Sequence, residues 1–288
     1  MNRPALPACD VLVAGCGDVG TRLARALAAE GLRVAALTRG PARHAALAAH
    51  GIPALAADLD AGLPALPAAA RVYHLVPPPA RGEDDPRLAR LLAALPRPPA
   101  RLVYLGTTGV YGDQGGAWTD EDTPPRPARP AARRRLAAEG RAQASGAGAV
   151  VVLRVAGIYG PDRLPRRLLA SGLALPEPAE APWTNRIHVD DLVTTLRRAG
   201  ADDAPPGVYD VADGDPRRMT EYLWAVADHL GLPRPPTRPL AEVLATAPPA
   251  LAAYLGESRR IRARRLRERL GVHPRPFTLG GDRPPPQG

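Results

Sequence analysis

The chain of 288 residues contains no lysine, so all 38 of its fully charged basic residues are arginines. This absence excludes a phosphate-binding lysine of the Walker type, a Schiff base and a tyrosine activated by a lysine. The net charge is +9, but arginine is spread through a chain rich in Ala, Pro and Gly, which indicates a compositional bias. The densest basic stretch, residues 259–269, has apolar residues at near-helical spacing and predicts an amphipathic helix with a solvated basic face. No nucleic-acid-binding motif accompanies it, so no nucleic acid partner is expected.

Cysteines and long apolar runs are also scarce. Cys9 and Cys16 are the two cysteines, too few for a disulfide framework and poorly placed to pair across a predicted strand. No apolar run approaches the roughly 20 residues of a membrane span, and no signal-peptide-like region precedes the first strand. No His/Cys/Asp cluster has the spacing of metal ligands, so no metal is expected. We therefore expect a cytoplasmic protein without a membrane partner.

The most informative segment is a glycine-rich loop near the N-terminus. An apolar run at residues 11–14 predicts a buried strand, and residues 18–30 predict an amphipathic helix. Between them lies G-x-G-x-x-G, in which the glycines allow a tight turn, backbone approach to a pyrophosphate and close helix–strand packing. Amide groups at the helix N-terminus would face the phosphate charge. The predicted dinucleotide contacts of the loop are Gly15, Cys16, Gly17, Asp18, Val19 and Gly20.

The end of the second predicted strand, residues 33–38, bears on which dinucleotide binds. An NAD site would carry a carboxylate there for the ribose 2'-hydroxyl, but this chain has Thr38 and Arg39. A guanidinium offers paired donors to a 2'-phosphate, so NADP is favoured over NAD. The alternative is that Arg39 is a solvated side chain in an arginine-rich protein.

Strands and helices alternate through the first half, which predicts an α/β fold with a Rossmann-type doubly wound parallel sheet and a smaller C-terminal substrate lobe. We predict a dinucleotide-binding domain over residues 1–157, a substrate lobe with returning strands over 158–279, and a disordered tail over 280–288. Further strands are predicted at 52–57, 71–76, 101–105, 150–155 and 208–211, and further helices at 41–50, 86–95 and 130–145.

Ligands of such sheets bind beyond the carboxyl ends of the strands. Three segments are therefore expected to converge on the reacting end of the dinucleotide. They are Leu75-Val76-Pro77, Gly106-Thr107-Thr108 and residues 156–159, which end in Tyr159.

These segments also carry a resemblance to a known family. The chain resembles the extended short-chain dehydrogenase/reductase superfamily, the sugar-nucleotide epimerases and dehydratases, from the glycine loop to about Gly271. The motifs that carry it are Val72-Tyr73-His74-Leu75, Thr107-Thr108-Gly109-Val110-Tyr111-Gly112-Asp113, Asp120-Glu121-Asp122-Thr123-Pro124, Leu153-Arg154, Ile158-Tyr159-Gly160-Pro161 and Arg186-Ile187-His188-Val189-Asp190-Asp191-Leu192.

The resemblance breaks at the groups that move protons. Typical members use a Ser or Thr, a Tyr and a Lys four residues after that Tyr. In the family, a short alanine-rich stretch that ends in Glu follows this Lys, and here that stretch is Leu136-Ala137-Ala138-Glu139. Counting back from it places Arg135 at the lysine position and Ala131 at the tyrosine position. Thr107 matches the Ser/Thr position, and Gly157 replaces a substrate-binding Asn. Alanine transfers no proton, and arginine holds its proton too tightly to act as an acid.

Two side chains are candidates for a replacement acid, beside Thr107 and Arg135 at the predicted catalytic end. Tyr111 follows the fifth strand and could face the cleft, with packing in its turn as the alternative. His188 has a suitable ordinary pKa, with a structural role as the alternative. Tyr159 is expected to lie against the nicotinamide as a packing residue.

The sequence thus predicts an NADP(H)-binding oxidoreductase or epimerase-like enzyme with a non-standard proton donor. Its substrate would be a small or nucleotide-linked carbonyl or carbinol compound. The alternative is a non-catalytic NADP(H) sensor or partner-binding protein that kept the dinucleotide site and lost the chemistry. The resemblance also implies a homodimer, formed through a helix such as that predicted at 130–145.

Overall fold

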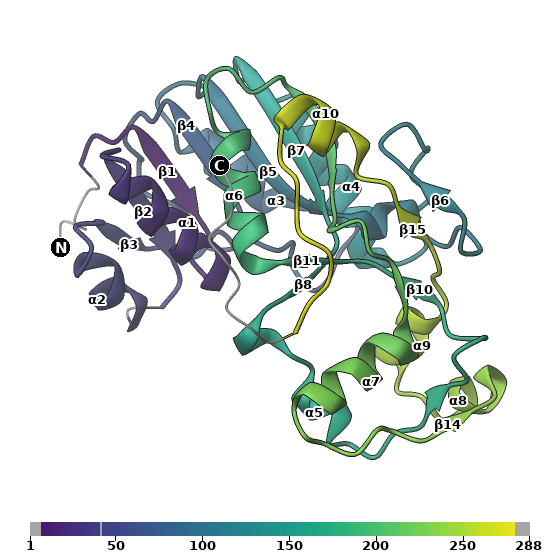
Figure 1. Ribbon diagram of the computed structural model, residues 1–288. Coiled ribbons are helices and arrows are strands. Elements are labelled where there is room, and N and C mark those ends of the chain that lie inside the picture. Colours follow the sequence, from purple (N-terminus) through teal and green to yellow (C-terminus); the bar gives the residue numbers. More distant parts are fainter. Residues whose placement is uncertain (1–6, 41, 280–288) are drawn as a thin grey trace.

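The computed structural model describes residues 7–40 and 42–279. Its centre is a parallel sheet that has seven strands in the described residues, in the order β12-β7-β5-β4-β1-β2-β3 (Figure 1). The strands are β1 Val11–Ala14, β2 Val34–Thr38, β3 Ala54–Ala56, β4 Arg71–His74, β5 Arg101–Thr107, β7 Ala149–Val155 and β12 Gly207–Val211. The strand order reverses between β1 and β4, as in Rossmann folds. The predicted doubly wound parallel sheet is confirmed.

Both faces of the sheet are covered, which is why its strands read as continuous apolar runs. Val11 and Val13 of β1 point to one face, packed with α1 (Asp18–Ala29), α6 (Val189–Ala199) and α10 (Arg264–Leu270). Leu12 and Ala14 point to the other face, against α3 (Pro86–Ala93) and α4 (Pro130–Gln143). Figure 1 shows α6 in front of the sheet and α3 and α4 behind it. Helix α2 (Ala42–Ala48) packs through Leu47 on the α1 face.

A smaller lobe lies below the carboxyl ends of the strands in Figure 1, around a separate apolar cluster that includes Tyr159, Tyr222 and Phe277. Its helices are α5 Arg166–Leu169, α7 Met219–His229, α8 Leu240–Thr246 and α9 Pro249–Leu255. Two 3-10 turns, η1 Thr108–Tyr111 and η2 Pro161–Arg163, follow β5 and β8. Short strand pairs complete the fold: β8 Gly157–Tyr159 with β11 Arg186–His188, β6 Trp118–Thr119 with β15 Arg260–Ile261, β9 Leu175–Pro176 with β14 Thr237–Arg238, and β10 Trp183–Thr184 with β13 Arg217–Arg218.

The chain after residue 158 builds this lobe and also returns to the sheet through α6, β12 and α10. The division at 157/158 therefore stays a prediction, and the predicted tail at 280–288 lies outside the described residues.

The prediction of one basic helix over 259–269 is wrong. Arg260–Ile261 is a strand, and the helix begins at Arg264. The Asn185 side chain holds the segment extended, because its Nδ2 donates to Arg259 O (3.0 Å) and its Oδ1 accepts from Ile261 N (2.7 Å). A tertiary contact overrides the local helical spacing here. The basic face is not simply solvated either, since Arg264 and Arg265 pair with Asp122.

Candidate functional site

The larger cavity, which we call the glycine-loop pocket, has a volume of about 490 Å³. It lies at the carboxyl ends of β1 to β4, where the strand order reverses. Its lining residues are Ala14, Gly15, Cys16, Gly17, Leu37, Thr38, Arg39, Gly40, Ala42, Arg43, Ala57, Asp58, Leu59, Leu75, Val76, Pro77 and Arg87. Eight of the predicted dinucleotide contacts are therefore gathered in one cavity.

The three loop glycines are needed for different reasons. A Cβ on Gly15 would lie 2.9 Å from the backbone N of Val76, and one on Gly20 would lie 2.4 Å from Gly15 O. Gly15 also has a φ of 98°, which side chains rarely adopt. A Cβ on Gly17 would meet nothing within 4 Å, so the loop backbone is open on the pocket side. This cradle of backbone at a helix N-terminus fits the pyrophosphate of a dinucleotide.

Three of the predicted loop contacts do not line this pocket. Val19 and Gly20 are buried under the loop. Asp18 accepts hydrogen bonds from Arg22 Nε (2.9 Å) and Arg163 Nε (2.7 Å). Burial opposes ionisation of Asp18, but these arginines lower the pKa of its carboxyl overall. Asp18 thus ties α1 to η2 instead of facing the cavity.

Two arginines at the far end of the pocket are exposed, Arg39 after β2 and Arg43 in α2. In the described chain neither has a carboxylate within ion-pair distance, although about half of the described arginines do. Cys16 lines the pocket with a buried thiol, and burial raises the pKa of Cys16 to about 12. The thiol therefore stays protonated at neutral pH.

A second pocket, of about 170 Å³, lies at the carboxyl ends of β5 and β7. Thr107 begins η1, and its Oγ1 accepts from Gly109 N (3.1 Å), which leaves the hydroxyl proton for another acceptor. The pocket is lined by Thr107, Thr108, Gly109, Arg129, Val155, Ala156, Gly157, Trp183, Thr184, Asn185, Tyr254, Glu257 and Arg259.

Both arginines of the second pocket are bound to its one carboxylate. Arg129 donates to both oxygens of Glu257, at 2.7 and 2.8 Å. Arg259 donates to the same carboxylate at 2.9 Å. Because the Glu257 side chain is only 6% exposed, this arrangement forms a fixed wall of the pocket.

Tyr111 lies outside both pockets, so the structure does not place it at the cleft. Its ring is fully buried, and its hydroxyl lies 3.0 Å from Asp210 Oδ1 and 2.9 Å from Arg154 Nη1. Burial, and then the charge of Asp210, raise the pKa of the Tyr111 hydroxyl far above its usual value. Arg154 forms a buried ion pair with Glu139 of α4 (2.8 Å). Tyr111 thus belongs to a closed structural network and does not supply a proton to a ligand.

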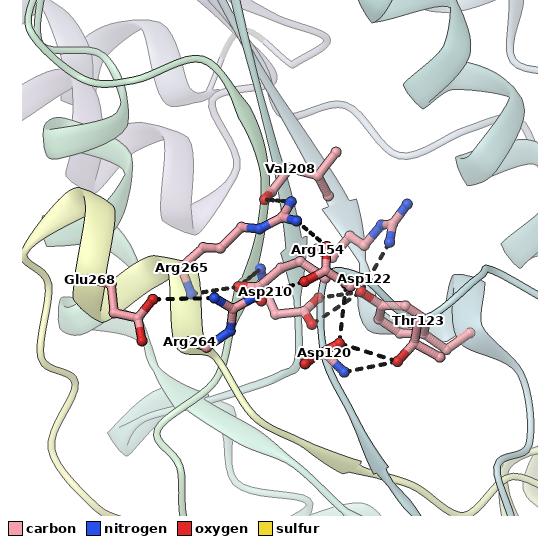
Figure 2. Close-up of polar contacts among 11 residues, drawn as sticks. Asp120, Asp122, Thr123, Arg154, Val208, Asp210, Arg264, Arg265 and Glu268 are labelled. Carbon is pink, nitrogen blue, oxygen red and sulfur yellow. Dashed lines mark hydrogen bonds and ion pairs between the residues drawn. The ribbon is translucent and has the colours of Figure 1, made fainter.

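Figure 2 shows how this network continues to the C-terminal helix. Arg264 and Arg265 of α10 reach Asp122, and Arg265 also lies beside Val208 O. The backbone N of Asp210 and that of Arg265 donate to one oxygen of Glu121, at 3.3 and 3.0 Å. The acidic loop at 120–122 therefore holds β12 and α10 together through hydrogen bonds and ion pairs.

The three remaining predicted residues line neither pocket. Arg135 donates to Leu105 O (2.8 Å), behind the end of β5. His188 begins α6, where its Nδ1 accepts from Asp190 N (3.2 Å). Tyr159 is 1% exposed and packs edge-on against His188 at 5.1 Å between ring centres. His188 thus has the structural role that the sequence left open as an alternative. Arg135 and Tyr159, both predicted to contact the dinucleotide, line neither of the two pockets.

Several lining residues escaped the sequence analysis. Arg43 follows Arg39 by four residues, a spacing that could have drawn attention to it. Arg129, Tyr254 and Glu257 carry no local signal, because the pocket assembles them from segments far apart in the sequence.

A metal site would require grouped ligand side chains, and a membrane span would require a long apolar helix. Among the described residues, no three or more His, Cys, Asp or Glu side chains are grouped so as to hold a metal ion. No helix in the described ranges is long and apolar enough to cross a membrane.

Solved structures share this fold over nearly the whole chain. A conserved protein of unknown function from Silicibacter pomeroyi DSS is 32% identical, with a TM-score of 0.75, over 92% of this chain and 93% of that one. The Thermus thermophilus UDP-glucose 4-epimerase, in complex with NAD, is 24% identical, with a TM-score of 0.65, over 89% and 91%. The Bordetella bronchiseptica enzyme WbmG, in complex with NAD, is 16% identical, with a TM-score of 0.72, over 96% and 92%.

No curated protein matches the chain. A family model, described as the NAD dependent epimerase/dehydratase family, matches residues 11–212. That match spans the glycine loop, the carboxyl ends of the strands that line the two pockets, and strand β12. The chain belongs to the NAD dependent epimerase/dehydratase family.

Proposed function

We propose that this protein binds NADP(H) and acts as an oxidoreductase or epimerase-like enzyme on a small or nucleotide-linked carbonyl or carbinol substrate. The observation that carries the proposal is the glycine-loop pocket, which combines an open backbone cradle with two unpaired arginines. No carboxylate stands at the end of β2 to hold a ribose 2'-hydroxyl. Paired guanidinium donors at that point suit a 2'-phosphate.

Each group has a defined part in this proposal. Backbone amides in the first turn of α1, residues 18–20, would hold the pyrophosphate, because the amides of Gly15, Cys16 and Gly17 already donate to backbone carbonyls. Arg39 and Arg43 would hold the 2'-phosphate. Val76 and Pro77 would line the path towards the second pocket, where Thr107 would orient a substrate oxygen. Bound NADP(H) would supply or accept a hydride at the substrate carbon. Arg135 would support the end of β5 from behind rather than touch the reacting atoms.

A second candidate function is a non-catalytic NADP(H) sensor. One observation favours it: the family's tyrosine and lysine positions hold Ala131 and Arg135, and Tyr111 is closed off in an ionic network. Binding of NADPH without consumption by any carbonyl compound would support the sensor. Consumption would support the enzyme.

The proposal is tested by titrating the protein with NADPH and with NADH, followed by fluorescence. The Arg39→Asp variant should lose about 10- to 100-fold in NADPH affinity relative to NADH, the value of charged hydrogen bonds to phosphate. Arg25→Asp is a matched control, because Arg25 is an exposed α1 residue outside the pocket and undergoes the same charge change. An unchanged NADPH/NADH ratio in Arg39→Asp would remove Arg39 from the proposal, and no binding of either dinucleotide would overturn it.

We further propose a cytoplasmic location and a homodimer. The dimer is checked by light scattering of the purified protein across a concentration series.

A further inference from the structure

The second pocket contains a tyrosine, Tyr254, that does not stand at the position of the family's catalytic tyrosine. Tyr254 comes from α9, in the C-terminal lobe, and is the only tyrosine among the lining residues. It shares the pocket with Thr107, whose hydroxyl proton is free to bind a substrate oxygen. Its side chain is 36% exposed, whereas Tyr73, Tyr104, Tyr111, Tyr159 and Tyr209 are at most 1% exposed. Tyr254 is therefore a solvent-accessible phenol in the same pocket as Thr107.

A buried arginine lies directly beside this hydroxyl. Arg186 Nη1 donates to the Tyr254 hydroxyl at 3.3 Å and to Asn185 O at 2.8 Å. The guanidinium carbon lies 4.1 Å from the centre of the Tyr222 ring, which fixes its plane. Within the described chain no carboxylate comes within ion-pair distance of Arg186. A buried cation without an ion-pair partner favours the phenolate form of a neighbouring tyrosine.

The glycine at 157 is what lets Arg186 reach this place. A Cβ at Gly157 would lie 3.1 Å from Arg186 Nη1 and 3.2 Å from its Cδ. Any larger residue at 157 would therefore press on the arginine. Gly157 itself lines the second pocket, so the guanidinium lies just behind the pocket wall.

We propose that Tyr254 is the proton donor and acceptor of this protein, and that Arg186 is the positioning residue that stabilises its phenolate. The proposal rests on the proposed NADP(H)-dependent function. In the reducing direction, the Tyr254 O–H bond breaks and its proton goes to the carbonyl oxygen, while hydride from NADPH forms the new C–H bond. The products are a carbinol, NADP⁺ and the Tyr254 phenolate beside Arg186, and a solvent proton restores the phenol. Thr107 donates a hydrogen bond to the same substrate oxygen.

Other charged groups face this pair and must be controlled. Glu257, Arg129 and Arg259 line the same pocket, where both arginines are bound to the one carboxylate and leave a net positive charge that is the same in every variant compared. Asp213 donates its backbone N–H to Arg186 O (2.8 Å), and burial raises the pKa of its carboxyl to about 7. The titration described next is therefore performed with Asp213→Asn, which removes that carboxyl from every variant compared.

The first experiment places 3-nitrotyrosine at position 254 of the full chain, where its phenolate absorbs visible light. We expect the phenolate band to be weaker at a given pH in Arg186→Gln than with Arg186 present, because the cation 3.3 Å from the hydroxyl is removed. Arg186→Lys, which keeps the cation, should recover most of the band. Arg218→Gln is the matched control, because Arg218 lies in the same lobe but donates to Ala181 O. A band of the same strength at the same pH with and without Arg186 would overturn the pairing.

The second experiment measures NADPH oxidation with glyceraldehyde, diacetyl and a UDP-linked 4-keto hexose as probes. Tyr254→Phe should lower kcat by about 10²- to 10⁴-fold and leave NADPH affinity unchanged. Tyr209→Phe, which removes a buried hydroxyl bound to Pro205 O, should keep its kcat. Full turnover by Tyr254→Phe would overturn the proposal, and this comparison still decides if Arg186→Gln fails to fold. Failure of the wild type to bind NADPH would instead overturn the proposed function, so the two failures are distinguishable.

Discussion

The two pockets lie along the same edge of one sheet, yet they are built in opposite ways. The glycine-loop pocket takes most of its wall from consecutive residues after β1, β2 and β4, and its two exposed arginines are unpaired. The second pocket draws on β5, β7, β10, α9 and Arg129, the residue before α4, and its arginines are bound to Glu257. The first pocket is formed by short, consecutive segments and has positive charge that is not paired. The second is a tertiary assembly with charges that hold one another in place.

This difference matters for the chemistry proposed. A phosphate is bound by free charge, so unpaired guanidinium groups belong in the first pocket. A reacting carbonyl needs fixed geometry and one mobile proton. Paired charges provide fixed geometry, because each side chain is held by several hydrogen bonds.

A large loss of stability is expected from breaking the buried ion pair between Arg154 of β7 and Glu139 of α4. Removing the carboxylate in Glu139→Leu leaves Arg154 buried without its partner and should lower the free energy of unfolding by about 3 kcal/mol. The measurement is urea unfolding at neutral pH. The double variant Glu139→Leu with Arg154→Met should recover most of the loss, since an apolar pair replaces the buried ions. Equal stability of the single and double variants would contradict the role given to this pair.

The glycine-loop pocket should separate packing from ligand binding at two neighbouring positions. Gly20→Ala places a Cβ against Gly15 O and should destabilise the fold by about 1–3 kcal/mol. Gly17→Ala meets no protein atom and should keep its stability, while its methyl group lowers NADPH affinity by about 10-fold or more. Thermal unfolding and NADPH titration of both variants check this. A stable Gly20→Ala protein, or unchanged NADPH binding by Gly17→Ala, would show that the loop is arranged differently.

A pH-dependent prediction concerns Asp213, whose backbone N–H donates to Arg186 O. Because burial raises the pKa of Asp213 to about 7 from an unfolded value near 4, the folded state binds this proton more tightly. Its contribution to stability is fully present below about pH 4 and is lost as pH rises through about 7. Asp213→Asn, which imitates the neutral acid, should be more stable than the wild type by up to about 4 kcal/mol at about pH 8 and similar at about pH 4, since one pKa unit corresponds to about 1.4 kcal/mol. Unfolding curves at the two pH values measure this, and a difference independent of pH would disagree with it.

Much of the fold could be predicted because its signals are local. The run Val11–Ala14 is apolar on both faces, as a strand covered by helices must be, and the glycines that follow it fix the turn into α1. The same locality gathered Gly15, Gly17 and Arg39 into one cavity. Where a tertiary contact competed with local spacing, as Asn185 does with residues 260–261, the local prediction of a helix was wrong.

The roles of single polar side chains were harder to predict, because a residue's type does not say what surrounds it. Tyr111 and Tyr254 are both tyrosines that follow short apolar stretches, yet one is closed in by Asp210 and Arg154 and the other faces a pocket. The His188 ring accepts a hydrogen bond from a backbone amide at the start of α6, and no neighbouring residue in the sequence indicates this role. Only the spatial environment distinguishes a structural hydroxyl or imidazole from one that can move a proton.

The sequence by itself determined the parallel sheet and the dinucleotide-type glycine loop of this protein. Both depend on apolar periodicity and glycine spacing within about 30 residues. The tertiary structure alone decided which charges are free and which tyrosine reaches the second pocket. Those outcomes depend on contacts between distant segments: Arg129 and Glu257 are 128 residues apart, and Arg186 and Tyr254 are 68 residues apart. Ionisation and proton transfer are set by distances of a few ångströms and by burial, which the folded chain fixes across such separations.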